Sequence, residues 1–177
     1  MLPNPSLPFT IATDASKVAI GGVLLQDHGS GLQPVEYISR TMLPAERNYP
    51  VHQQELLAVV YFCHAWQHFL KGADFEVALN LPSDSDPYRL TIQTDHRPLT
   101  HLLSQPNLTP RQARWMEFLA QFAPFRVQYV KGVDNVVPDA LSRRPDYAFF
   151  EDIDVFNQQW FLYPPPFRVY LYMVPPP

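Results

Sequence analysis

The pattern of apolar and polar residues along this 177-residue chain predicts five β-strands. Three apolar runs lie near the N-terminus, and the short segment between the first two permits a tight antiparallel return. Two further runs follow, each after a stretch with helical spacing. The five expected strands are residues 8–14, 18–26, 34–40, 89–95 and 124–132.

Helical spacing appears first in residues 51–70. Apolar side chains recur there on one stripe, formed by Ala58, Val59, Phe62, Trp66 and Phe69. Such a stripe predicts a helix that packs on the sheet. Glu55 falls on the same stripe, where a charge is not expected.

Three shorter helices are expected later in the chain. Residues 97–105 predict a short helix, and Thr109 followed by Pro110 is a typical helix start. In that second helix the apolar positions Ala113, Met116 and Ala120 have helical spacing. Residues 135–144 predict the last helix, entered through Pro138. Strands clustered early and then alternating with helices favour an α/β fold, a five-stranded mixed sheet flanked by helices.

Composition divides the chain into one domain and two flanking segments. With 46% hydrophobic and 17% charged residues, the middle of the chain can bury a sizeable core. The 20 prolines crowd the two ends. We therefore expect a linker at residues 1–7, the domain at 8–145 and a tail rich in proline and aromatic residues at 146–177. Within the domain, residues 73–89 resemble an exposed, inserted loop.

Charge and cysteine content narrow the possible settings. The net charge of −4 gives no diffuse basic field, so contact with nucleic acid has to be local or assisted by another chain. A single cysteine, Cys63, excludes an intramolecular disulfide and suits a reducing compartment. No apolar run reaches membrane-spanning length. We expect an intracellular chain without a membrane partner.

Four carboxylates stand where the hydrophobic pattern disfavours them. Asp14 ends the first expected strand, Glu55 lies on the long helix, Asp95 ends the fourth strand and Asp139 opens the final helix. Each comes from a different element, so only tertiary folding can bring them together. Taken singly, each is also compatible with an ordinary role as a turn former, a helix cap or a solvated helix residue.

A cluster of these carboxylates would require cations. Buried like charges repel one another and lose solvation, and divalent ions remove both penalties. Oxygen ligands without cysteine or histidine suit two Mg²⁺ ions, with Mn²⁺ as a substitute. Such a pair can clamp the attacking and leaving oxygens of a phosphodiester. The cluster therefore indicates a nuclease site.

Four motifs in the chain resemble the ribonuclease H domain of Ty3/Gypsy-type long-terminal-repeat retrotransposon reverse transcriptases. They are "PFTIATDASKVAIGGVLLQ", "PVEYISRTMLPAERNYPVHQQELLAVV", "IQTDHRPLTHLL" and "RQARWMEFLAQFAPFRVQYVKGVDNVVPDALSR". The resemblance spans about residues 8–144 in the family's order. It implies the ribonuclease H-like fold and metal-dependent hydrolysis of the RNA strand of an RNA/DNA hybrid. It also implies a polymerase domain in the same polyprotein, in the cytoplasm or nucleus or in virus-like particles.

The resemblance assigns roles to individual residues. Asp14 matches the carboxylate that touches both metals, Glu55 and Asp95 those that complete one metal site, and Asp139 the one that completes the other. Tyr129 matches a family tyrosine near the site. One departure is Pro138, where the family usually has alanine; proline is accepted in the first turn of a helix, so Asp139 keeps its place there.

Other interpretations of the sequence remain as alternatives. Arg111 and Arg114 lie at helical spacing and either grip phosphates or face solvent. The run of Cys63, His64 and His68 offers too few ligands for a closed zinc site. A catalytically inactive or domesticated module that only binds nucleic acid is the main alternative to a nuclease. A DNA transposase of the same fold is a third.

Overall fold

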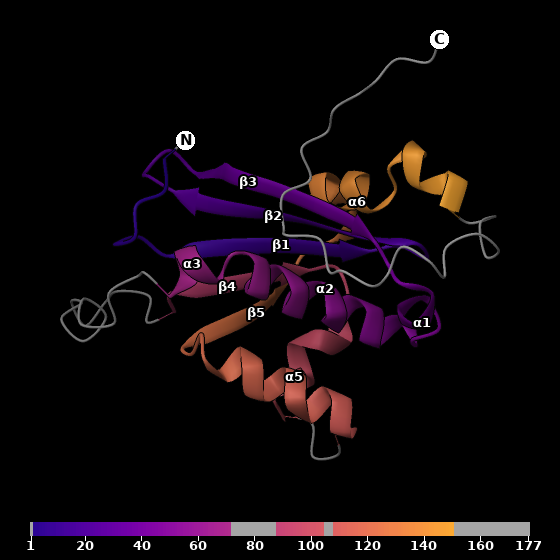
Figure 1. Ribbon diagram of the computed structural model, residues 1–177. Helices are drawn as coiled ribbons and strands as arrows, with labels where there is room; N and C mark the ends of the chain where they lie inside the picture. Colours follow the sequence, from indigo (N-terminus) through magenta and orange to yellow (C-terminus); the bar gives the residue numbers. More distant parts are fainter. Residues whose placement is uncertain (1, 72–87, 105–107, 151–177) are drawn as a thin grey trace, which may run out of the picture.

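The computed structural model describes residues 2–71, 88–104 and 108–150 (Figure 1). Most of the expected inserted loop, 73–87, and most of the expected tail, 151–177, lie outside these residues. In the described part of the chain, no helix is both long and apolar enough to cross a membrane.

One five-stranded mixed sheet forms the centre of the fold, in the order β3-β2-β1-β4-β5 (Figure 1). β1 pairs antiparallel with β2, and β2 antiparallel with β3. β4 lies parallel to β1 on one side and to β5 on the other. The predicted α/β class and all five strands are confirmed, as β1 (Phe9–Ala15), β2 (Ala19–Asp27), β3 (Leu32–Thr41), β4 (Leu90–Thr94) and β5 (Phe125–Tyr129).

The predicted helices are present, with one interruption and several short additions. The long helix is split at Trp66, whose backbone angles of φ −99° and ψ 13° depart from the α-helical region. The segment after β4 is a 3₁₀ helix. In chain order the helices are α1 (Pro44–Arg47), α2 (Val51–Ala65), α3 (Gln67–Leu70), η1 (Arg97–Ser104), α5 (Pro110–Ala120), η2 (Gly132–Asp134), α6 (Val136–Ser142) and η3 (Pro145–Phe150).

The start of α5 follows the sequence prediction, and its buried face follows it in part. The Thr109 hydroxyl accepts from the Gln112 backbone N–H, and the Gln112 side chain accepts from the Thr109 N–H. Of the predicted apolar positions, Met116 packs half-buried against the core, whereas Ala113 and Ala120 are exposed. The buried residues of this helix are Gln112, whose side chain closes the cap, and Leu119, whose large apolar side chain gains more by burial than alanine does.

Two adjacent glycines in β2 place helices on opposite faces of the sheet. A Cβ atom on Gly22 would lie 2.6 Å from the Phe62 ring of α2, and one on Gly21 would lie 2.5 Å from the Pro138 carbonyl of α6. Successive strand residues face opposite sides of a sheet. α2 therefore covers one face and α6 the other, as Figure 1 shows.

The main core lies between the sheet and α2, with α5 packed against it. Phe62 and Trp66 are fully buried and stack with ring centroids 5.3 Å apart. The Trp66 indole N–H also donates to the Glu36 carboxylate at 3.0 Å. This packing fixes α2 on the sheet, and with it the position of Glu55 near the start of the helix.

Candidate metal centre

Asp14 and Asp95 meet because their strands are parallel neighbours. β1 and β4 pair in register from Phe9 with Leu90 to Ala12 with Gln93. Continuing that register by two residues sets Asp14 opposite Asp95, which directly follows β4. The carboxyl ends of parallel strands open at the same edge of a sheet. The two carboxylates therefore share one edge.

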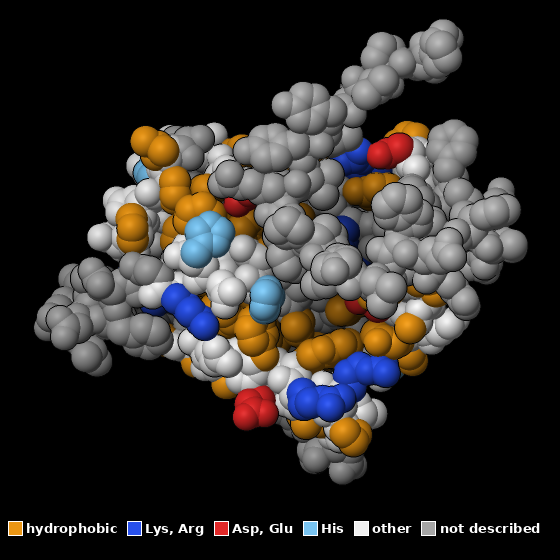
Figure 2. Space-filling model, in the orientation of Figure 1, with side chains coloured by type: hydrophobic (Ala, Val, Ile, Leu, Met, Phe, Trp, Pro, Cys, Tyr) orange, Lys and Arg blue, Asp and Glu red, His pale blue; other side chains and the backbone are white. Residues whose placement is uncertain are grey.

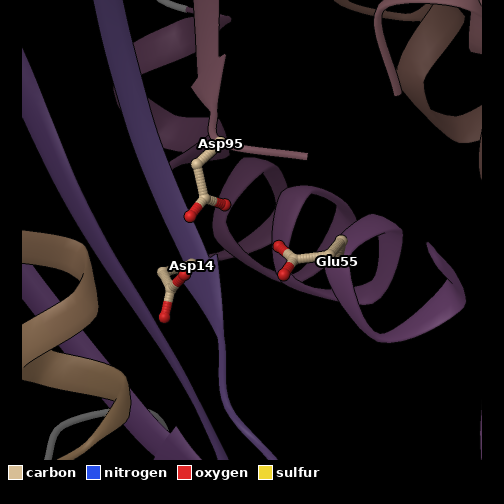
Figure 3. Close-up of side chains that lie close together, drawn as sticks. All are labelled: Asp14, Glu55 and Asp95. Atoms are coloured by element: carbon tan, nitrogen blue, oxygen red, sulfur yellow. The ribbon is translucent and has the colours of Figure 1, made fainter. Parts of the chain in front are cut away.

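Glu55 reaches the same edge from the face covered by α2. Its side chain points from the helix toward Asp14 and Asp95 (Figure 3). One carboxylate oxygen from each of the three residues lies within 4.8 Å of the others. Asp14 is 2% exposed and Glu55 5% exposed. Three of the four predicted carboxylates are thus brought together, two of them buried.

The electrostatics of this cluster disfavour three negative charges in the absence of a cation. Burial, followed by the charges of Asp14 and Asp95, raises the pKa of Glu55 from 4.5 to about 9. Burial also raises the pKa of Asp14 above its ordinary value of 3.8, although the hydrogen bond from Ser142 offsets part of this rise. Within the described residues, Glu55 Oε2 is buried without a hydrogen-bond partner. An all-oxygen cluster with a buried, unpartnered acceptor fits a hard divalent cation such as Mg²⁺ or Mn²⁺.

Asp139 lies beside this group rather than inside it. It occupies the first turn of α6, as the sequence predicts. Its Oδ1 atom accepts from Arg143 Nε at 2.5 Å. Asp139 is nevertheless close enough for its charge to raise the pKa of Asp14. The fourth carboxylate therefore borders the cluster while paired with an arginine.

Ser142 is a site residue that the sequence analysis missed. Its hydroxyl is fully buried and donates to Asp14 Oδ2, and the Asp139 carbonyl, 3.0 Å away in the same helix, is a second acceptor within reach. Only one signal in the sequence could have found it: Ser142 follows Asp139 by three positions, so the two lie on neighbouring parts of one helix surface.

Tyr129 lies near the cluster, together with an arginine that the sequence analysis did not single out. Tyr129 ends β5 and pairs with Thr94, the residue before Asp95. The Arg97 guanidinium lies 4.6 Å from the centroid of the Tyr129 ring. A cation stacked on an aromatic ring therefore flanks the Asp95 side of the site.

Arg111 and Arg114 lie on α5, where Figure 2 shows basic side chains at the lower end of this face. The Arg111 guanidinium lies 4.0 Å from the Tyr49 ring centroid and donates to Gln53 Oε1 at 3.2 Å. Arg114 is exposed. Among the described residues, no hydrogen bond or ion pair joins either arginine to the carboxylates.

A zinc site on α2 finds no support in the described residues. Cys63 is fully buried, and burial raises the pKa of its thiol to about 12. A thiol with such a pKa is a poor source of the thiolate that zinc requires. The three carboxylates are the group of potential metal ligands found in this part of the chain.

Comparison with known proteins identifies the family. Two family models, each described as an RNase H-like domain found in reverse transcriptase, match residues 1–77 and 85–122. The Pol polyprotein of transposon 412 from Drosophila melanogaster is 38% identical over 141 residues, which is 80% of this chain and 10% of that polyprotein. The Tf2-3 transposon polyprotein of Schizosaccharomyces pombe is 38% identical over 145 residues, again 80% of this chain and 10% of the polyprotein.

Solved structures agree on the fold. LC11-RNase H1, whose structure was determined in complex with an RNA/DNA hybrid, matches with a TM-score of 0.53 at 14% identity, over 75% of this chain and 92% of its own. The present chain spans about a tenth of the length of its curated relatives, which include the gypsy Pol polyprotein of Drosophila melanogaster, 35% identical over 80% of this chain and 12% of that polyprotein. The chain belongs to the RNase H-like domains of reverse transcriptases, and its relatives are Pol polyproteins of gypsy/Ty3-family retrotransposons.

Proposed function

We propose that this chain is a metal-dependent ribonuclease H that hydrolyses the RNA strand of RNA/DNA hybrids during retroelement reverse transcription. The observation that carries the proposal is the cluster of Asp14, Glu55 and Asp95, whose ligand oxygens lie within 4.8 Å of one another. A protein tolerates such a cluster when cations neutralise it. Family membership and the hybrid bound by LC11-RNase H1 support the choice of substrate.

The carboxylates have separate roles in this proposal. Asp14 would hold two Mg²⁺ ions, Glu55 and Asp95 would complete the coordination of one, and Asp139 that of the other. When bound, such a pair of ions supplies Lewis-acid activation of the phosphodiester and neutralises the charge that develops on it. Burial of Asp14 and Glu55 keeps the ligands away from bulk water and fixes their orientation.

Residues around the cluster would hold the substrate. Tyr129 and Arg97 form a flat, cationic surface beside Asp95, suited to a sugar and its phosphate. Arg111 and Arg114 on α5 would contact phosphates farther from the scissile bond. These contacts position the backbone of the hybrid and carry no sequence preference.

The polymerase domain of the same polyprotein is the proposed protein partner. The relatives are Pol polyproteins that extend far beyond the matched region. A neighbouring domain that holds the hybrid would supply the basic surface that a chain of net charge −4 lacks. The chain would then act where reverse transcription occurs, in the cytoplasm, the nucleus or virus-like particles.

Hybrid cleavage tests the proposal directly. An RNA/DNA hybrid with labelled RNA is incubated with the chain and Mg²⁺, with duplex DNA and a chelator as controls. We expect RNA products with 3′-hydroxyl and 5′-phosphate ends, no cutting of duplex DNA, which lacks the 2′-hydroxyl, and no cutting with the chelator. The matched variant is Asp95→Asn.

Two results would contradict the proposal. Equal cutting of hybrid and duplex DNA would indicate a different nuclease. If the wild type and Asp95→Asn both bind the hybrid but neither cleaves it in Mg²⁺ or Mn²⁺, the result would favour the inactive binding module.

A further inference from the structure

Three buried hydrogen bonds join α6 and its N-cap residue to the end of β1 and the residue that follows it. The Ser142 hydroxyl donates to Asp14 Oδ2, the Ser16 hydroxyl donates to the Ser142 carbonyl at 2.8 Å, and Asn135 Nδ2 donates to the Thr13 carbonyl at 2.9 Å. Ser142 is 0% exposed. Of the three bonds, only that of Ser142 ends on a carboxylate of the candidate metal centre.

Gly21 explains how α6 comes close enough for this bond. It is the cross-strand partner of Asp14 in the pairing of β1 with β2. A Cβ atom at Gly21 would lie 2.6 Å from the Ser142 backbone nitrogen and 2.7 Å from Leu141 Cβ. These distances are shorter than any real side chain allows. The missing side chain beside Asp14 therefore creates the space in which α6 delivers Ser142.

A neutral hydroxyl has a specific advantage at this position. The terminal torsion of an aspartate side chain is soft, so a carboxylate needs a partner to fix its plane. A lysine or arginine could provide that partner, but its charge would repel a divalent cation. The Ser142 hydroxyl orients Asp14 without adding positive charge. Partners of this kind are worth about 10–100-fold in metal affinity at known metal sites.

We propose that Ser142 is a positioning residue of the metal centre. Its hydroxyl fixes the Asp14 carboxylate in the orientation that faces Glu55 and Asp95, and it couples this orientation to the docking of α6, the helix that carries Asp139. The inference rests on the proposed function, because it assumes that Asp14 binds metal. The competing explanation is that Ser142 only anchors a helix, as Asn135 does.

The test compares Ser142→Ala with Asn135→Ala. Each variant removes one buried hydrogen bond to β1, from α6 in Ser142→Ala and from the N-cap residue of α6 in Asn135→Ala, but only the first bond reaches Asp14. Ser142→Ala also removes the 3.0 Å contact of the hydroxyl with the Asp139 carbonyl inside α6. Calorimetric titration with Mn²⁺, without nucleic acid, measures metal affinity, and urea denaturation measures stability. We expect Ser142→Ala to weaken Mn²⁺ binding about tenfold. Asn135→Ala should leave it within about twofold, with a comparable loss of stability in both.

Ser142→Cys covers the case in which the alanine variant does not fold. It fills the same space with a weaker donor, and we expect a metal affinity between those of the wild type and the alanine variant. Equal Mn²⁺ affinity in the wild type and Ser142→Ala, or equal weakening in Ser142→Ala and Asn135→Ala, would overturn the inference. A wild type that binds Mn²⁺ but does not cleave hybrid would overturn the proposed function alone. A wild type that binds no Mn²⁺ would overturn both.

Discussion

Arg143 Nε lies 2.5 Å from Asp139 Oδ1, so the fourth predicted carboxylate already has a cationic partner one helical turn away. The pair is largely exposed, with side-chain exposures of 61% and 46%. The pKa values of Asp14 and Glu55 are raised, chiefly by burial, and the Arg143 charge offsets a small part of that rise. Arg143 therefore offsets part of the negative charge that a metal ion would otherwise neutralise.

Removal of this charge should make metal binding easier. In Arg143→Gln, the metal ion no longer competes with an arginine for the Asp139 carboxylate. We therefore expect the Mg²⁺ concentration for half-maximal hybrid cleavage to fall. An exposed helical pair contributes only about 0.3–0.5 kcal/mol, so the change should be about twofold. Cleavage rates across a Mg²⁺ series measure it. A large rise in the Mg²⁺ requirement would show instead that Arg143 assists catalysis.

Asp14→Asn should abolish activity without unfolding the chain. Asparagine keeps the shape of the side chain but removes the charge that both metal ions would share. The loss of cleavage should exceed about 100-fold, the upper end of the range for residues that only support a ligand. Stability without metal should be equal or higher, because repulsion with Glu55 and Asp95 is relieved. Urea denaturation beside the cleavage assay checks both statements, and near-normal cleavage would contradict the assignment of Asp14.

The raised pKa of Glu55 predicts how stability without metal depends on pH. The unfolded chain ionises Glu55 near its ordinary pKa of 4.5, whereas the folded chain retains the proton until about pH 9. The stabilisation from protonated Glu55 is therefore complete below pH 4.5 and is lost as pH rises toward 9. The loss per pH unit is at most about 1.4 kcal/mol.

Glu55→Gln isolates this effect from other titrations. In a chelator, urea denaturation at pH 5, 7 and 9 should show wild-type stability falling more steeply than that of the variant. At pH 7 the variant should be the more stable protein. Saturating Mg²⁺ should flatten the wild-type curve because the bound ion favours ionised Glu55. Parallel curves for the two proteins in chelator would contradict the raised pKa.

Gly21→Ala should displace α6 from the sheet. The new methyl group would lie 2.5 Å from the Pro138 carbonyl, and backbone atoms cannot yield as a flexible side chain does. Overpacking of this kind costs about 1–3 kcal/mol of stability. Because α6 carries Asp139 and Ser142, we also expect weaker Mn²⁺ binding, measured by calorimetry. Normal metal affinity in a destabilised variant would show that the site tolerates movement of α6.

The strands, the long helix and the three clustered carboxylates could be predicted from the sequence for one physical reason. Strands and the long helix have strong periodicity, and Asp14, Glu55 and Asp95 are visible because each violates it. A residue whose polarity fits the local hydrophobic pattern gives no such signal. Ser142 is an ordinary polar residue on a short helix until α6 is placed beside Asp14.

Other details depend on packing that no local pattern contains. The paired glycines of β2 were visible in the sequence, but their role depends on two helices that approach from opposite faces. On α5, spacing alone could not distinguish the exposed Ala113 and Ala120 from the buried Leu119. The pairing of Asp139 with Arg143 likewise requires the helix to be formed first.

The surface charge of the chain sets the last prediction. The chain has 13 lysines and arginines against 17 aspartates and glutamates. Several arginines are already engaged, since Arg40, Arg143 and Arg144 form ion pairs with nearby acids. In the described part of the chain, Arg97, Arg111 and Arg114 form no ion pair, so their charges are not neutralised by a carboxylate and remain available to attract phosphates.

With so few phosphate contacts, the isolated chain should bind hybrid weakly and gain activity from a tethered polymerase. On duplex DNA, log affinity falls by about 0.9 per contacted phosphate for each tenfold rise in salt, and a weak starting affinity leaves little binding at physiological salt. Fusion to the polymerase domain of the same polyprotein would compensate for the weak affinity, because the polymerase would hold the hybrid at a high effective concentration near this domain.

Steady-state cleavage at low and physiological salt, with the isolated chain and the fusion, measures the effect. We expect low cleavage by the chain alone, falling further at physiological salt, and a large increase in the fusion, abolished by Asp14→Asn. Strong, salt-resistant cleavage by the isolated chain would show that its own surface holds the hybrid.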